Sequence, residues 1–93
     1  MQEQTDKYKK VDEAVKNFGG VVHDFRIMNH LTLQDMAELV SLSASYLWRI
    51  ENNRRNPDLD VRVRILTTGL CWSTEDIHLY LEQIILKEET NQC

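Results

Sequence analysis

Apolar residues recur at steps of three and four along most of the chain, the spacing of amphipathic helices. The pattern is densest in residues 31–57, LTLQDMAELVSLSASYLWRIENNRRNP. It forms two short runs, interrupted by Ser41-Leu42-Ser43. The apolar positions are Leu33, Met36, Ala37 and Val40 in the first run, and Leu47 and Ile50 in the second. The pattern therefore predicts two short helices, each with one buried face.

Polar residues at the start of each run predict where these helices begin. Thr32 and Asp35 have the spacing of a capping box, in which each side chain bonds to the other residue's backbone N–H. Ser43 is a plausible N-cap for the second helix. Two short helices joined by a tight turn form a helix-turn-helix unit, which we place at residues 32–53.

The chain before this unit divides into an extension, residues 1–17, and a first core helix. In the extension, apolar residues at helical steps favour an amphipathic helix from about Thr5 to Asn17, and the alternative is a frayed arm. These apolar residues are Tyr8, Val11, Val15 and Phe18. Gly19-Gly20 should break or cap this segment. The core helix should then run to about Asn29, with Val22, Phe25 and Met28 on its inward face.

Two further helices are predicted after the unit. The first runs from Leu59 to Thr68, with Asp58 as its N-cap and Gly69 at its end. We expect it to bury Leu59, Val63 and Leu66 and to leave Arg62 and Arg64 more exposed.

The last helix, at about residues 74–88, begins at the capping-box pair Ser73 and Asp76 and leaves 89–93 as a tail. One apolar face holds Ile77, Tyr80, Leu81, Ile84 and Ile85. Leu79 and Leu86 lie on the opposite face. We favour a homodimer interface that includes Leu79, Ile85 and Leu86, because a helix with two apolar faces usually packs against two partners. The alternative is a helix that only wraps its own core. Residues 18–88 would form one all-α domain.

The charge distribution is compatible with DNA binding, although the net charge is −4. Basic residues gather in the middle of the chain: Arg49, Arg54, Arg55, Arg62 and Arg64. Acidic residues collect in the outer parts, notably Glu75, Asp76, Glu82, Glu88 and Glu89. One basic face on an acidic body suits a nucleic-acid ligand.

The residues of this stretch resemble the phage-repressor/Cro-like (XRE-type) helix-turn-helix family. Its members read L-T-Q-x-x-L-A-x-x-L-G-V-S-x-x-Y-L-S-R-I-E-N-G-x-R-x-P. The chain matches at Leu31, Thr32, Ala37, Ser43, Tyr46, Leu47, Arg49, Ile50, Glu51, Asn52, Arg55 and Pro57. The likeness continues outward to about Phe18 and Leu81. It implies a five-helix lambda-repressor-like fold and a structural ion pair between Arg26 and Glu51.

The resemblance also implies a DNA-reading surface on the second helix of the unit. The expected base contacts are Ala44, Ser45, Trp48 and Arg49. Arginine can form two hydrogen bonds to guanine, and alanine can touch a thymine methyl group. The expected phosphate contacts are Thr32, Gln34, Ser43, Asn52, Asn53, Arg54 and Arg55.

Four residues depart from the family pattern. His30 and Ser41 replace glycines that usually close the first two helices, and Leu33 replaces a glutamine that braces DNA contacts. Trp48 stands where many members carry a small or polar residue. Its indole could stack on a sugar-phosphate edge, anchor a protein partner, or fold over Tyr46.

Catalytic and metal-binding functions are not indicated. His23, His30 and His78 have no metal-ligand spacing with Cys71 or Cys93, and no phosphate loop or nucleophile motif occurs. We expect no cofactor, no small-molecule ligand and no disulfide. No transmembrane run or signal peptide is apparent, which favours a cytoplasmic protein, associated with the nucleoid when it is bound to DNA.

Two functions remain open from the sequence. The favoured one is a dimeric, sequence-specific transcriptional regulator, such as a repressor, that binds double-stranded DNA. The other is a protein-interaction module on the same fold, an antirepressor or assembly partner. It is motivated by Leu33, Ala44, Trp48 and the acidic net charge.

Overall fold

The computed structural model describes the chain from Gln2 to Gln92, and its side chains over residues 7–87. All regular structure in this part is helical. The elements are α1 (Gln2–Lys16), α2 (Phe18–Met28), α3 (Leu33–Val40), α4 (Ala44–Glu51), α5 (Leu59–Arg64), a π-helical turn η1 (Ile65–Gly69) and α6 (Thr74–Gln92). The all-α fold predicted from the sequence is confirmed.

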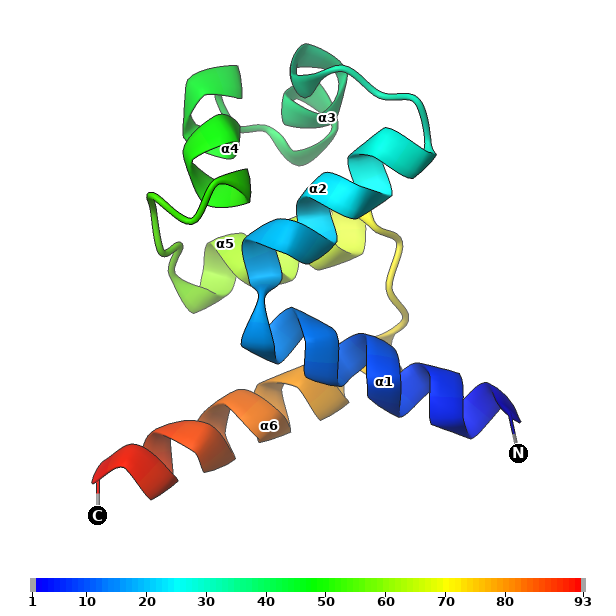
Figure 1. The fold of residues 1–93 in the computed structure, drawn as a ribbon, viewed down its shortest axis with the longest axis vertical. Coiled ribbons are helices and arrows are strands. Elements are labelled where there is room, and N and C mark those ends of the chain that lie inside the picture. Colours follow the sequence, from blue (N-terminus) through cyan, green and yellow to red (C-terminus); the bar gives the residue numbers. More distant parts are fainter. Residues whose placement is uncertain (1, 93) are drawn as a thin grey trace.

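The helices are arranged so that α3 and α4 lie at one end of the molecule and the α1–α6 pair at the other (Figure 1). Helices α2 and α5 lie between these ends and connect them. All of these helices except α5 contribute buried residues to the core, as does η1. Its buried residues are Val11, Ala14, Phe18, Val22, Met36, Ala37, Val40, Leu47, Ile50, Ile65, Leu66, Leu70, Trp72, Ile77 and Tyr80.

The N-terminal extension is a helix that ends at Lys16, close to its predicted end, but the two glycines do not make the break. Asn17 leaves helical geometry and caps α2, since its side-chain oxygen accepts a hydrogen bond from the Gly20 backbone N–H. The break therefore falls before Gly19-Gly20, and both glycines lie inside α2. Gly19 allows α2 to approach α4, because a Cβ atom there would lie 2.2 Å from the Ile50 carbonyl oxygen.

The start and end of α3 and the start of α4 follow the sequence signals. Thr32 and Asp35 form both hydrogen bonds of a capping box, and the Ser43 side chain accepts from the Tyr46 N–H. His30 and Ser41 adopt left-handed backbone conformations, with φ of 58° and 59°. Both non-glycine residues therefore keep the turns that the family builds with glycine, at some conformational cost.

The predicted helix from Leu59 to Thr68 is instead two segments. After α5, the Leu70 N–H bonds to the Ile65 carbonyl, a five-residue step that widens the helix into η1. Leu59 is 42% exposed rather than buried, because the register of α5 turns it outward. Arg62 instead lies against the body of the molecule.

One prediction about packing and one about a helix end differ from the structure. Met28 is 77% exposed, at the last residue of α2. The last helix continues past Glu88 to Gln92, so the predicted tail at residues 89–93 is helical as far as it is described.

Helix α1 is held against the start of α6 by charged contacts that the sequence pattern did not indicate. Lys10 Nζ donates to Asp76 Oδ2 at 2.7 Å and lies 4.8 Å from the centre of the Trp72 ring. Lys7 Nζ donates to Glu75 at the same distance. Burial alone would raise the pKa of Asp76, but hydrogen bonds from Lys10 and Ser73 outweigh it and lower that pKa.

Candidate nucleic-acid interface

One face of α4 is exposed, and it carries most of the predicted base-contacting side chains. Ser45, Trp48 and Arg49 are exposed, as is Asn52 at the C-terminal end of the helix. Ala44 is only half-exposed and packs against the core. Because Leu47 and Ile50 are buried on the opposite side, α4 cannot rotate without uncovering the core.

Trp48 and Arg54 form a pair on this face. The Arg54 guanidinium lies 5.5 Å from the centre of the Trp48 ring, within the range of a cation–π contact. Trp48 is 44% exposed, so its ring keeps a solvent-facing part. The backbone supports the arrangement, since the Arg54 N–H bonds to the Arg49 carbonyl at 2.8 Å and the turn at Asn53 has a φ of 58°.

Glu51 at the end of α4 is buried in an ion pair with α2. Arg26 Nε donates to Glu51 Oε2 at 2.8 Å, and a second guanidinium nitrogen donates to Oε1 at 3.1 Å. The pair implied by the family resemblance therefore forms. Its two parallel bonds fix α4 relative to α2, as two-pronged arginine–carboxylate pairs do.

His23 joins this pair, which sequence reasoning missed. Its Nδ1 lies 3.0 Å from Glu51 Oε1. His23 and Arg26 are three residues apart on α2 and so share a face of that helix, a spacing that could have suggested the contact. Since Glu51 is satisfied internally, its charge does not oppose the arginines on the exposed face of α4.

The loop after α4 is held in place by Arg62. Its guanidinium donates to the Pro57 carbonyl at 2.9 Å, to the Tyr80 hydroxyl at 3.0 Å and to the Asn56 side chain. It also lies 5.2 Å from the centre of the Phe18 ring. Arg62 thus connects the loop to α2 and α6. Helical spacing on α5 gave no sign of this role, because all four partners come from other segments.

The remaining predicted phosphate contacts lie at helix starts and in the loop. Thr32 and Ser43 are exposed residues that cap α3 and α4. Gln34 is exposed and donates to Glu38 at 3.3 Å. Asn52, Asn53 and Arg55 are exposed around the end of α4. Arg49, Arg54 and Arg55 are thus all exposed, on α4 and on the loop that directly follows it.

Comparison with known protein families shows which family this chain belongs to. The model of a helix-turn-helix family, HTH_3, matches residues 22–67, from α2 into η1. The chain belongs to this XRE-type helix-turn-helix family. Helix-turn-helix domains of this family bind DNA. No curated protein and no solved structure matched the chain.

The helix-turn-helix match leaves α1 and α6 outside its bounds. Within the described residues, no group of three histidine, cysteine, aspartate or glutamate side chains is placed to hold a metal ion. No helix in the same part of the chain is long and apolar enough to cross a membrane. Cys71 is a free, exposed thiol, and Cys93 lies outside the described residues.

Proposed function

We propose that this helix-turn-helix protein is a sequence-specific transcriptional regulator that binds a two-fold operator as a homodimer. The observation that carries the proposal is the exposed face of α4. It presents Arg49, with Arg54 and Arg55 behind it, while the carboxylate of Glu51 is neutralised internally.

In this proposal α4 enters the major groove with its exposed face toward the bases. Arg49 would form two hydrogen bonds to a guanine, Ser45 would bond to a neighbouring base edge, and Ala44 would touch a thymine methyl group. Trp48 would contact a base edge or the adjoining sugar while it holds Arg54.

Phosphate contacts would hold the protein in register on the duplex. Thr32, Gln34 and Ser43 lie at helix starts, where free backbone N–H groups favour an anion. The other contacts would come from the end of α4 and the loop: Asn52, Asn53, Arg54 and Arg55. These contacts add affinity without selecting a sequence.

The homodimer would form through α6. Ile85 and Leu86 are 52% and 54% exposed, and Leu79 is half-buried beside Tyr8 of α1. A two-fold operator would require this contact to hold two copies of α4 about 34 Å apart, one turn of DNA. A dimer bound to its operator in the cytoplasm would then block access of RNA polymerase to that DNA and so repress transcription.

Selection of duplexes from a random pool by the purified protein tests the proposal. We expect enrichment of an inverted repeat with half-site centres about 10 base pairs apart. Duplexes selected with the Arg49→Ala variant should no longer show a preference for guanine at one position of each half-site. A pool that stays random after repeated rounds would contradict the proposal and would favour a protein-interaction module on the same fold.

A further inference from the structure

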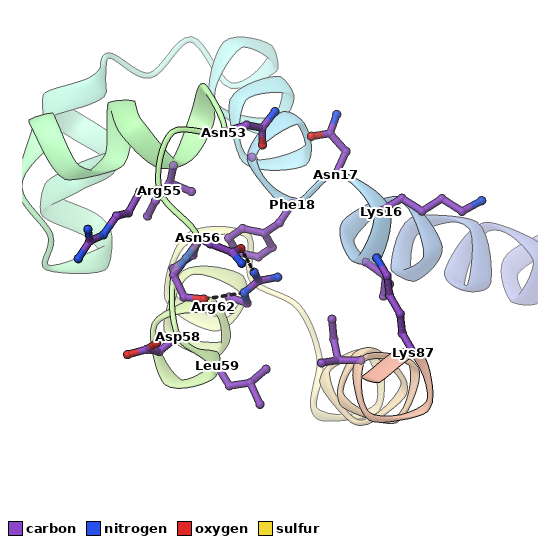
Figure 2. Close-up of a pocket in the computed structure, with 15 residues that line it drawn as sticks. Lys16, Asn17, Phe18, Asn53, Arg55, Asn56, Asp58, Leu59, Arg62 and Lys87 are labelled. Carbon is purple, nitrogen blue, oxygen red and sulfur yellow. Dashed lines mark hydrogen bonds between the residues drawn. The ribbon is translucent and has the colours of Figure 1, made fainter. Parts of the chain in front are cut away.

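A groove with a volume of about 510 Å³ lies beside the loop that follows α4. Its walls come from the end of α1, the start of α2, the loop, the start of α5 and α6 (Figure 2). It therefore joins the helix-turn-helix domain to the two helices outside the family match.

The charged side chains that line the groove are mostly basic. They are Lys16, Arg55, Arg62 and Lys87, with Asp58 as the one acidic residue among the described lining residues. Figure 2 shows Arg55 on the loop side, Arg62 in the middle, and Lys16 and Lys87 on the side of α1 and α6. A chain with a net charge of −4 thus concentrates positive charge here.

These basic groups differ in how many hydrogen bonds and ion pairs they already form within the protein. All three guanidinium nitrogens of Arg62 donate hydrogen bonds within the protein. Lys16 pairs with Asp12 at 3.0 Å, but both groups are exposed, and exposed pairs of this kind hold a lysine weakly. Within the described part of the chain, Arg55 and Lys87 form no ion pair. At least three cations are therefore available to a ligand.

The groove is also continuous with the proposed DNA-binding surface. Asn53 and Arg55 line it and belong to the loop that directly follows α4. A duplex that lies along α4 must carry its phosphates past this loop, at a spacing of one charge per about 1.7 Å of helix axis.

We propose that this groove binds the DNA backbone next to the half-site, with Lys16 and Lys87 as phosphate contacts supplied by α1 and α6. The inference rests on the proposed DNA-binding function and extends it. The two helices outside the family match would add affinity and lengthen the protected site, and would leave the sequence preference to α4.

Fluorescence anisotropy over a range of salt tests this inference with a duplex selected by the full-length protein. The variants are Lys16→Gln, Lys87→Gln and the double variant. Lys9→Gln is the matched control, because Lys9 is an exposed lysine of α1 that does not line the groove. Circular dichroism checks that each variant is folded, which we expect because all three lysines are exposed.

Each lost phosphate contact should reduce the slope of log affinity against log salt by about 0.9. When the salt concentration rises fourfold, both proteins should bind more weakly. The fold-loss of affinity should be about ten times smaller for the double variant than for wild type. The reduction should be equal for matched and mismatched duplexes, and Lys9→Gln should keep the wild-type slope.

Two outcomes would overturn the inference, and they are distinguishable. If the wild type binds its duplex selectively but the double variant keeps its slope, the groove is not a DNA contact and the proposed function stands. If the wild type shows no selective binding of any duplex, the proposed function fails and the groove inference falls with it. An acidic protein segment would then be the ligand to seek.

Discussion

Trp48 and Arg54 are six residues apart in the sequence, and only the turn at Asn53 brings them together. From the sequence, Trp48 could be assigned to the exposed face of α4 but not to a partner. The structure gives it one, since Arg54 lies over its ring. The indole therefore acts as a support that restricts where the guanidinium can lie.

We expect the two residues to be coupled in DNA binding. Exposed cation–π contacts contribute about 0.5–1 kcal/mol, so the losses caused by Trp48→Ala and Arg54→Ala should overlap by about that amount in the double variant. Anisotropy titrations of the four proteins with one selected duplex measure the overlap. Strictly additive losses would show that Trp48 and Arg54 act independently.

Gly19 shows how a single residue sets the distance between two helices. An added methyl group would meet the Ile50 carbonyl oxygen, which cannot move without breaking α4. Gly19→Ala should therefore lower the free energy of unfolding by about 1–3 kcal/mol, as overpacking does. Chemical denaturation measures this loss.

Gly20→Ala is the control for that substitution. Its added methyl group meets only the Asn17 side chain, which can turn away. Loss of the Asn17 cap should lower stability by about 1 kcal/mol, and the better helix propensity of alanine should raise it by a similar amount. An equal loss of stability in both variants would contradict the role given to Gly19.

At the level of elements, the sequence predicted those features that depend on residues close together in the chain, namely helix caps and buried helix faces. The caps at Thr32 and Ser43 and the buried faces of α3 and α4 depend on spacing over a few residues, and all were predicted. The contacts of Arg62 with Tyr80 and Phe18 and the charged contacts between α1 and α6 join residues 18 or more positions apart, so spacing could not reveal them. The π-helical turn also escaped prediction, because helical periodicity assumes a constant number of residues per turn.

The charged contact between α1 and α6 should make the stability of the fold depend on pH in the acidic range. Because the pKa of Asp76 is lowered from its usual 3.8 in the folded chain, the ionised carboxylate stabilises the fold above that value. This contribution should disappear as pH falls through the lower, folded-state pKa. Thermal melts of wild type and Asp76→Asn between pH 2 and 7 measure it.

The two melting temperatures should differ most near neutral pH and should converge below about pH 4. A difference that stays constant over the whole range would mean that the charge of Asp76 contributes nothing. In that case packing alone would hold α1 against α6.

At the scale of the whole molecule, the exposed face of α4 and the proposed dimer surface on α6 belong to different parts of the fold. Helices α3 and α4 form one end, and the C-terminal part of α6 extends from the other (Figure 1). Ile85→Glu places a charge on the proposed dimer surface. It should therefore convert the dimer to a monomer in sedimentation experiments and leave the helical content unchanged.

Ile27→Glu is the matched control for this substitution, since Ile27 on α2 is 51% exposed against 52% for Ile85. It should not change the association state. A wild-type chain that sediments as a monomer at micromolar concentration, or an Ile85→Glu variant that remains a dimer, would contradict the proposed interface.

The most direct test of the central claim is an anisotropy titration of wild type, Arg49→Ala and Arg64→Ala with a selected duplex and a scrambled one. Arg64 is the control because it is exposed but belongs to α5. Loss of one two-bonded guanine contact costs about 1–3 kcal/mol, so Arg49→Ala should weaken specific binding about ten- to a hundredfold and Arg64→Ala should not. Equal affinity of wild type for both duplexes, or an Arg49→Ala variant that still distinguishes them fully, would contradict a DNA-reading role for α4.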